Sequence, residues 1–420
     1  MTGILFLTFL GLLALGVPIA FSVAMAATAV LIVGDVPVIL IVQRMFAATD
    51  SFPLVAVPFF ILAGDLLARG TISKKLVEFA EAVMGQVRGA LSAVSVVAAM
   101  FFAAISGSGA ATTAAVGATL IPELKARKYR EDSAAALIAS AGCIGVVIPP
   151  SVPMVLYAVI ADQSVTRLFQ NGFIPGLMMG GVLIAISLKQ AYDRNYPKGV
   201  PFSFKNVVRT FVSAIWGIMM PLIILGGIFS GQFTPSEAAA VAVIYAALAS
   251  FFIYRDLTLK ELYKIILGSA RTSAIIMIII ACSGIFGWVL ANWKIPETVA
   301  QAVLSVSDNT YAVLFLMSVI ILIAGVFMET ASAVILLTPV FLPLVKLIGV
   351  DLIHFGILFT VGIAIGMVTP PVAINLFVAS SITGMRIERI AKAVVPYLLG
   401  LIAMFLIYVY IPLLFPGIIF

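Results

Sequence analysis

The sequence predicts an all-α polytopic membrane protein, and three features of the chain carry that prediction. First, 63% of the 420 residues are hydrophobic and 10% are charged, whereas a soluble protein carries about a quarter of its residues as Asp, Glu, Lys and Arg. Second, apolar stretches of spanning length, about 20 residues, recur along the chain. Third, a double proline interrupts such a stretch at corresponding places in the two halves of the chain. This composition excludes a soluble enzyme, a secreted domain and a disordered protein.

The charged and reactive residues exclude further classes of function. The formal net charge is +6, but the Lys and Arg residues are scattered between apolar runs, which is typical of topology signals and not of a nucleic-acid site. Cys143 and Cys282 lie in apolar stretches and are expected to pack as small hydrophobes. The one histidine, His354, provides neither a pair of imidazoles for zinc nor an obvious base beside a nucleophile. We therefore expect no nucleic-acid partner and no enzyme activity.

The apolar stretches predict eleven membrane spans. The first is expected to be retained, because residues 1–33 show neither a basic start nor a clear cleavage site. The predicted cores are 4–33, 53–68, 82–101, 133–162, 172–192, 210–230, 236–254, 272–291, 310–327, 354–382 and 393–415. Two amphipathic segments, 202–211 and 257–269, carry Lys and Arg among apolar residues and are predicted to lie along the interface.

Basic residues cluster in four connectors, which by the positive-inside rule are predicted to face the cytoplasm. The clusters are Lys125, Arg127, Lys128 and Arg130; Arg194, Lys198, Lys205 and Arg209; Arg255, Lys260, Lys264 and Arg271; and Arg386, Arg389 and Lys392. A further basic segment, 69–88, would lie on the opposite side from Lys125 if 82–101 crosses the membrane fully.

The two halves of the chain contain an internal repeat. Residues 145–152 (GVVIPPSV) align with 366–373 (GMVTPPVA) at a shift of 221, and 120–122 (LIP) align with 341–343 (FLP) at the same shift. Because two separate motifs keep one register, we interpret the chain as a duplication with repeats at 1–209 and 210–420.

Each double proline lies inside an apolar stretch and is predicted to break the helix there, near 133–162 and 354–382, because proline lacks the amide donor and clashes with the preceding turn. Broken backbone at membrane depth persists only where it is buried in protein or lines a cavity. A simple proline kink is the alternative for a single copy. Interruptions at corresponding places in both halves favour the binding site of a transporter.

The segment before each break is predicted to form a re-entrant helical hairpin. The first, 102–123, is too short to cross twice and has small polar residues at a tip from 106 to 109. The second, 325–343, has its tip near 328–332. A small-residue packing face between helices is the alternative for the first tip.

A hairpin tip that faces a broken helix offers half-helix N-termini for an anion and unwound carbonyls for sodium. Hydroxyls add hard oxygen ligands, which suit an alkali cation. The predicted sodium ligands are Ser106, Ser108, Gly145, Ile148 and Pro149, with Glu329, Thr330, Gly366, Thr369 and Pro370 as the repeat-related set. The predicted substrate ligands, for a carboxylate-bearing anion, are Ser108, Thr112, Pro150, Ser151, Thr369 and Val372. Sodium ions are expected as coupling ions, and no other cofactor is expected.

Two carboxylates stand in apolar surroundings. A central charge in a membrane span costs roughly 3 kcal/mol on insertion scales, so Glu329 is a functional candidate. The alternative is a carboxylate near the interface that caps the second hairpin. Asp65 is interpreted as the mark of a helix end.

Seven stretches of the chain together resemble the large membrane subunit of tripartite ATP-independent periplasmic (TRAP) transporters. They are 16–21 (GVPIAF), 58–64 (PFFILAG), 106–110 (SGSGA), 145–150, 271–273 (RTS), 325–329 (GVFME) and 366–371. They are distributed along nearly the whole chain, and their combination is specific to this family. The family often has Asp where this chain has Glu329, which weakens the transfer of a role to that side chain.

The resemblance implies an ion-transporter superfamily fold with two inverted repeats, in which a scaffold and a moving transport domain, each built from parts of both repeats, work as an elevator. It implies sodium-coupled import of an organic acid, such as a C4-dicarboxylate or sialic acid, across the bacterial inner membrane. It also implies two partners, a periplasmic binding protein and a small four-helix membrane subunit, here expected as a separate chain. The inversion conflicts with the even number of predicted spans between the hairpins, so one segment between 210 and 327 is expected not to cross.

Three other classes remain as alternatives. An ATP-driven pump would need a separate ATPase, because the chain has no Gly-x-x-x-x-Gly-Lys-Ser/Thr loop. An intramembrane protease could use the serines at 106–108 but lacks an obvious base. A stand-alone sodium/carboxylate symporter of the same fold, without a binding protein, is the nearest alternative.

Overall fold

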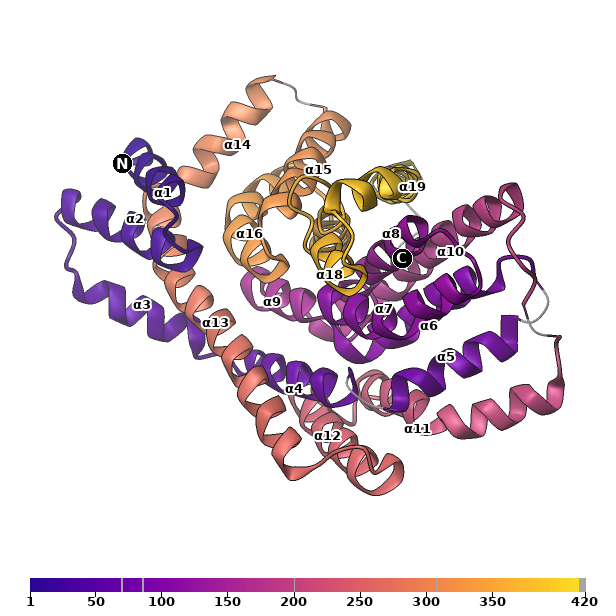
Figure 1. Ribbon diagram of the computed structural model, residues 1–420. Helices are drawn as coiled ribbons and strands as arrows, with labels where there is room; N and C mark the ends of the chain where they lie inside the picture. The colour runs from indigo at the N-terminus through magenta and orange to yellow at the C-terminus, as the bar shows by residue number, and fades with distance from the viewer. Residues whose placement is uncertain (69–70, 85–86, 200, 307–308, 415–420) are drawn as a thin grey trace.

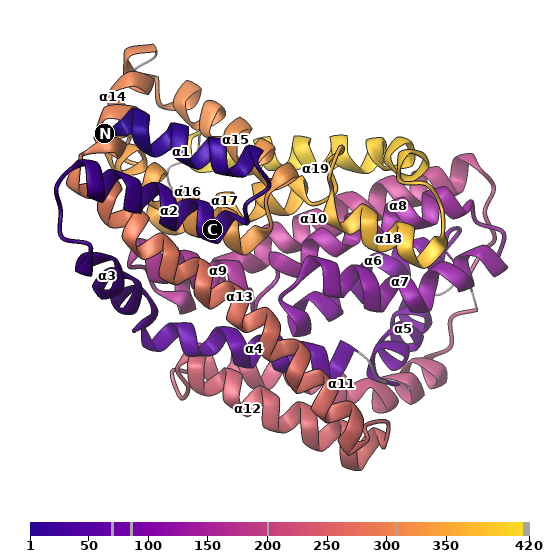
Figure 2. The same cartoon turned by 60° about the vertical axis from the view of Figure 1, so that its left-hand side comes forward.

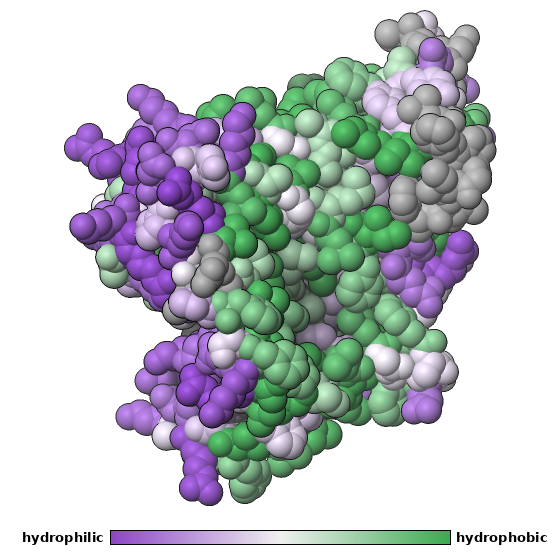
Figure 3. Space-filling view, turned by 90° about the vertical axis from the view of Figure 1, so that its right-hand side faces the viewer, coloured by the Kyte–Doolittle hydropathy of each residue, from purple (hydrophilic) through white to green (hydrophobic). Residues whose placement is uncertain are grey.

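The computed structural model describes residues 1–68, 71–84, 87–199, 201–306 and 309–414, most of which lie in helices (Figure 1). Within these ranges, seven helices are long and apolar enough to cross a membrane. They are α10 (Val165–Asp193), α11 (Phe204–Phe229), α12 with its continuation η3 (Pro235–Leu248 and Ala249–Tyr254), α13 (Leu259–Asn292), α15 (Thr310–Phe327), α16 (Thr330–Leu347) and α19 (Ile387–Leu414). Figure 3 shows a hydrophobic band between two hydrophilic sides, as expected for a protein that spans a bilayer.

The N-terminal helices differ from the predicted single span at 4–33. Two shorter helices, α1 (Thr2–Ala14) and α2 (Ile19–Val33), pack against each other on either side of a turn at Gly16, where φ is +80°. Next come α3 (Ile39–Thr49), η1 (Phe52–Val55) and α4 (Ala56–Ala68), with a bend of 67° between α3 and the segment that follows. The amphipathic helix α5 (Thr71–Met84) ends this part of the chain.

The repeat predicted from two short motifs extends through most of the helices. The helix α7 (Gly109–Ala126) shifted by 221 residues coincides end to end with α16. The same shift relates α6 (Ala90–Ser106) to α15, α8 (Glu131–Gly142) to α17 (Leu352–Gly366), α9 (Val152–Ala161) to α18 (Ile374–Thr383), and α10 to α19, within three residues. The bent pair α3 and α4 corresponds to the continuous helix α13.

Both predicted hairpins are present, with longer arms than expected. The first consists of α6 and α7 around a tip at Gly107, and the second of α15 and α16 around a tip at Met328. The predicted spans 82–101 and 310–327 are therefore wrong as separate crossings, because each is the first arm of a hairpin. Apolar composition alone could not show this, since a hairpin arm of 17 or 18 residues is as hydrophobic as a span.

This correction resolves both topological conflicts. A hairpin enters and leaves on the same side, so the segment before α6 lies with the segment after α7, and Arg127 forms a 2.6 Å ion pair with Glu81 of α5. Between the hairpins five of the predicted spans remain, namely the broken helix of α8, η2 (Cys143–Val146) and α9, then α10, α11, α12 and α13; the short helix α14 (Ile295–Val306) is not one of them. An odd number inverts the second repeat relative to the first.

The two predicted interfacial helices are not separate elements. Residues 202–211 continue into α11 and residues 257–269 continue into α13, which each form one unbroken helix. Ser203 caps α11, and Thr258 with Glu261 forms a capping box at the start of α13. Gly268 lies in the basic part of α13 without ending the helix, so in both helices the basic turns extend the span.

The helices form two groups. An inner bundle contains α6–α10 and α15–α19, with helices of each repeat packed on helices of the other. An outer layer contains α1–α5 and α11–α14, where α14 spans Ile295–Val306. In this layer α4 packs on α12, and α13 packs on α2 and α3 (Figure 2). The two hairpin tips and both broken helices lie in the inner bundle, and α4 and α13 contact it from the outer layer.

Candidate functional site

A cavity of about 220 Å³ lies between the hairpin tips and the helices α4 and α13. Its polar lining residues are Asp65, Ser106, Ser108, Thr272, Glu329 and Thr330. Among the described lining residues there are two carboxylates and no Lys or Arg. The cavity therefore combines hydroxyls and carboxylates from four separate parts of the chain, namely α4, the first tip, α13 and the second tip.

The first turns of four helices line this cavity, since Ala110, Pro153, Ala331 and Ile374 belong to the starts of α7, α9, α16 and α18. Each N-terminus carries a partial positive charge from its unpaired amides. Protein side chains cap three of them. Ser108 Oγ accepts from Ala111 N, Ser151 Oγ accepts from Met154 N, and Glu329 Oε2 accepts from Ala331 N and Ser332 N.

The fourth helix, α18, begins without a side-chain cap. Its preceding residue, Ala373, has φ +50°, and Val372 stands where the first repeat has the capping Ser151. The loss of this one hydroxyl distinguishes the two breaks, since a valine offers no acceptor to the first-turn amides. An oxygen from outside the protein could fill that place.

The first tip forms a compact hydroxyl cluster. Ser106 Oγ lies 2.8 Å from Thr112 Oγ1, which donates a 2.8 Å hydrogen bond to the carbonyl oxygen of Ser108. Gly145 packs directly on this cluster, because a Cβ added there would lie 2.6 Å from the Ser108 carbonyl oxygen. Only glycine allows this approach of the broken helix to the tip.

The second tip approaches its break in a similar way. A Cβ at Gly366 would lie 2.4 Å from Cα of Gly325, so these two backbones are in direct contact. Thr330 Oγ1 lies 3.3 Å from Met367 Sδ. Glu329 caps α16 and is exposed in the cavity, so it has the geometry of a hairpin cap while still presenting a carboxylate to the site.

The other predicted residues lie around the cavity without lining it. In the first break, Ile148, Pro149, Pro150 and Ser151 are buried, and Ser151 Oγ donates a 2.5 Å hydrogen bond to the carbonyl of Val146. In the second break, Thr369 Oγ1 donates to the carbonyl of Ile365, and Pro370 is exposed. The peptide bonds Pro149-Pro150 and Pro370-Pro371 are both cis. The two breaks thus share a cis Pro-Pro peptide bond but differ in solvent exposure.

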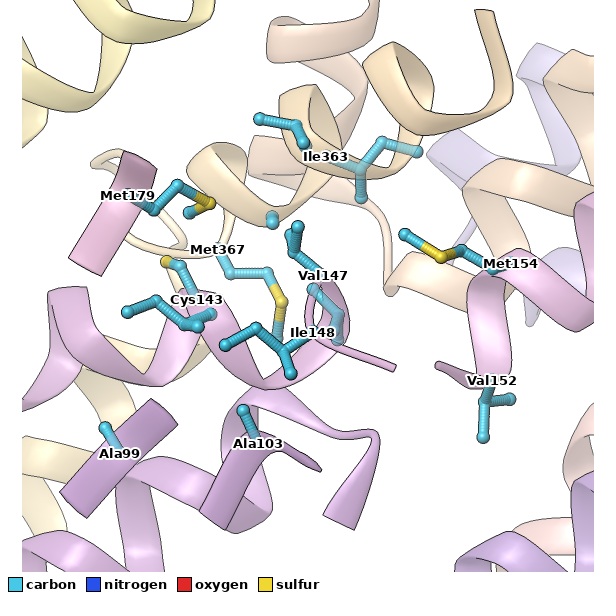
Figure 4. Packing of buried hydrophobic residues seen from close by; sticks show 14 of the residues in the cluster. Ala99, Ala103, Cys143, Val147, Ile148, Val152, Met154, Met179, Ile363 and Met367 are labelled. Carbon is cyan, nitrogen blue, oxygen red and sulfur yellow. The ribbon is translucent and has the colours of Figure 1, made fainter. Parts of the chain in front are cut away.

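Three side chains that the sequence did not predict as site residues belong to this region. Asp65 lines the cavity from α4, and its Oδ2 accepts a 2.6 Å hydrogen bond from Ser269 on α13. Met367 lies between the tips, because it contacts Thr330 and a Cβ on Gly109 would lie 3.0 Å from its Cε. Figure 4 shows Met367 pointing toward Cys143 and Ile148 of the first break. An ionisable residue in an apolar stretch was the available signal for Asp65.

The third side chain that the sequence did not predict as a site residue is Asn375, which is fully buried and joins the two repeats. Its amide nitrogen donates to the carbonyl of Ala139 on α8 and lies 3.7 Å from Cys143 Sγ. Its backbone amide donates to the carbonyl of Met367. A buried carboxamide in an apolar helix was the signal in the sequence, because such a group requires partners.

Comparison with known proteins agrees with this architecture. The family model described as the tripartite ATP-independent periplasmic transporter, DctM component, matches residues 6–414 of the sequence. The chain is 40% identical to the isethionate TRAP transporter permease protein DctMQ of Oleidesulfovibrio alaskensis, over 97% of this chain and 65% of that protein. It is 38% identical to the C4-dicarboxylate TRAP transporter large permease protein DctM of Pseudomonas aeruginosa, over 88% and 86% of the two chains.

A sialic acid TRAP transporter large permease protein, SiaM of Vibrio cholerae, is 34% identical over 93% of this chain and 92% of its own length. Among solved structures, the YdaH transporter of Alcanivorax borkumensis matches with a TM-score of 0.63 at 15% identity, covering 90% of this chain and 88% of that one, which shows the shared fold. Such relatives are permease subunits and not enzymes, and with the seven apolar helices they indicate a multi-pass protein of the inner membrane. The chain belongs to the family of large membrane subunits, or DctM components, of TRAP transporters.

Proposed function

We propose that this chain is the translocating subunit of a sodium-coupled importer, which receives an organic acid from a periplasmic binding protein and moves it through the cavity between the hairpin tips. Its family already makes it a component of a binding-protein-dependent transporter of organic acids. The observation that carries the finer proposal is a cavity with four helix N-termini, two carboxylates and no Lys or Arg among the described lining residues.

The four N-termini supply the attraction for an anion. Backbone amides at a helix start hold carboxylates and phosphates without a basic side chain. Since Ser108, Ser151 and Glu329 cap three of these helices, the start of α18 near Val372 is the place we propose for a substrate carboxylate. The other proposed substrate contacts are Ser108, Thr112, Pro150, Ser151 and Thr369.

The two carboxylates of the cavity make cations necessary for binding an anionic substrate. An anion that enters a cavity already holding Asp65 and Glu329 meets repulsion unless positive charge enters with it. Hydroxyl and carbonyl oxygens at the tips suit sodium. We propose one sodium site at Ser106, Ser108, Gly145, Ile148 and Pro149, and a repeat-related site at Glu329, Thr330, Gly366, Thr369 and Pro370.

The two groups of helices suggest how the substrate moves. We propose that the inner bundle is the transport domain and the outer layer is the scaffold of an elevator, so that each contains parts of the repeats at 1–209 and 210–420. Asp65 and Thr272 would then be scaffold contacts to the cavity, while both hairpin tips travel with the substrate.

The partners follow from the family. We propose a periplasmic binding protein and a small four-helix membrane subunit as a separate chain. A stand-alone sodium/carboxylate symporter is the alternative, and copurification of a small membrane subunit would distinguish the two.

The size of the cavity supports a small substrate. At about 220 Å³ it is smaller than the roughly 300–1,000 Å³ pockets that hold drug-sized ligands. Among the acids that relatives are named for, isethionate and C4-dicarboxylates fit this limit better than sialic acid. We propose a compact carboxylate or sulfonate.

The test is uptake of a radiolabelled acid into proteoliposomes that contain the purified membrane component. Each acid is supplied with its binding protein, in sodium and with sodium replaced by potassium. We expect uptake only with sodium and binding protein together. Full uptake in potassium would contradict the coupling, and full uptake without the binding protein would support the symporter.

A further inference from the structure

A basic hollow of about 710 Å³ lies at the turn between α18 and α19, at the opposite end of α18 from the transport cavity. Its lining residues are Ser380, Arg386, Ile387, Glu388, Arg389 and Lys392. Three of these six carry a positive charge and one carries a negative charge. The hollow therefore has the charge to attract an anionic group.

The neighbouring acidic residue does not neutralise these cations. Asp132 is 5% exposed, and Arg130 holds it through two hydrogen bonds of 2.6 and 3.1 Å. Arg389 reaches the same carboxylate only at 3.8 Å. In the part of the chain that the structure describes, Arg386 and Lys392 form no ion pair. Positive charge is left over on the wall of the hollow.

An exposed apolar face leads away from the hollow along α19. Lys392, Val395 and Leu399 follow each other at intervals of three and four residues, which places them on one side of the helix. Val395 is 45% exposed and Leu399 is 61% exposed, and Ile407 continues the face. α19 is long and apolar enough to span a membrane from Ile387 onward, and a span that starts there would put the hollow at headgroup level and this face in the hydrocarbon.

We propose that the hollow binds the phosphate of an anionic phospholipid, with an acyl chain along Val395 and Leu399 of α19. The basic end holds the headgroup by charge and hydrogen bonds, as basic pockets on the cytoplasmic side of membrane proteins do. The apolar face explains why a lipid fits better than a free phosphate, since only a lipid has both parts. Because the hollow belongs to the inner bundle, the lipid contacts that bundle and not the outer layer.

The experiment uses the purified membrane complex in detergent and measures retained lipid by native mass spectrometry, together with the thermal unfolding midpoint. The probes are phosphatidylglycerol, phosphatidylcholine and glycerol 3-phosphate. We expect phosphatidylglycerol to bind and raise the midpoint, and the other two to do neither. Equal binding of phosphatidylcholine, or of glycerol 3-phosphate, would overturn the proposal.

Variants locate the site. Each neutralised charge should weaken binding of phosphatidylglycerol about fivefold, so Arg386→Gln with Lys392→Gln should weaken it about 25-fold. This pair leaves the contact between Arg389 and Asp132 intact and so protects the fold. The matched control is Lys260→Gln with Lys264→Gln, two exposed cations on α13 that do not line this hollow. Leu399→Ser should also weaken lipid binding with no change of charge. Unchanged binding in the first pair, or an equal loss in the control pair, would overturn the assignment.

Discussion

The Asp65 carboxylate on α4 accepts a 2.6 Å hydrogen bond from the Ser269 hydroxyl on α13, although 204 residues separate them in the chain. This bond joins the two outer helices that face the hairpin tips and fixes a negative charge on the wall of the cavity. The Ser269 hydroxyl donates and the carboxylate accepts, so the hydrogen bond holds the carboxylate in position. The outer layer thus contributes an oriented acceptor to a site otherwise built from the inner bundle.

Asp65→Asn should lower the substrate concentration for half-maximal uptake by about three- to tenfold, because it removes about 1 kcal/mol of repulsion between the acid and a fixed charge. The measurement is concentration-dependent uptake into proteoliposomes. Ser269→Ala is the matched control, since it removes the hydrogen bond and keeps the charge. An unchanged half-saturating concentration in Asp65→Asn would show that this carboxylate has no electrostatic effect on the substrate.

Ser108→Ala should raise the sodium concentration for half-maximal uptake by about fivefold, because one oxygen ligand and one helix cap are lost together, about 1 kcal/mol. Thr369→Val, at the repeat-related site, should act in the same direction. Ser95→Ala is the control, since the Ser95 hydroxyl is buried on α6 but bonds to the Leu91 carbonyl away from the tip. If the sodium curves of both site variants match the wild type, the proposed ion sites are wrong.

Gly145→Ala should abolish transport and destabilise the protein by about 1–3 kcal/mol, the usual effect of overpacking. The added methyl would lie 2.6 Å from the Ser108 carbonyl oxygen and 2.5 Å from Thr112 Oγ1, so the tip must move away from the break. Thermal unfolding and uptake are the measurements. Gly181→Ala on α10, whose added methyl meets no atom within 4 Å, should leave both unchanged. A stable and active Gly145→Ala would contradict the close approach.

The pair of Arg130 and Asp132 predicts a dependence of stability on pH. Arg130 lowers the pKa of Asp132 below its ordinary value, chiefly through its side-chain hydrogen bonds. A carboxyl whose pKa is lower in the folded state stabilises the fold above its unfolded pKa of about 4, and that stabilisation is lost as pH falls through the folded pKa.

Asp132→Asn should therefore cost about 1.5–3 kcal/mol at neutral pH and flatten the loss of stability between about pH 4 and pH 2. Thermal unfolding across that pH range is the measurement. Glu131→Gln is the control, because its carboxylate pairs with the exposed Lys125 and such surface pairs contribute about 0–1 kcal/mol. Equal effects of the two variants would show that burial of Asp132 adds nothing.

The sequence predicted the hairpin tips and the helix breaks closely, because glycine and proline impose them locally. Single prolines lie inside α7, α10, α11 and α16 without ending them, whereas the double prolines Pro149-Pro150 and Pro370-Pro371 both mark breaks. Their shared shift of 221 residues is visible without a structure. The arms of the hairpins were not predictable in the same way. The helix α15 is as hydrophobic as a span, and only its packing beside α16 and α17 shows that it is the first arm of a hairpin.

The sequence by itself determined the bilayer environment, the duplication and the positions where helices must break, since each depends on composition or on the covalent chemistry of residues near in the chain. The tertiary structure decided which side chains meet. Asp65 with Ser269, Met367 with Gly109 and Asn375 with Ala139 join parts of the chain that are 204 or more residues apart. Such neighbours depend on how helices of one repeat pack against those of the other, and the packing of many side chains at once, unlike the break at a proline, is not written in any short segment.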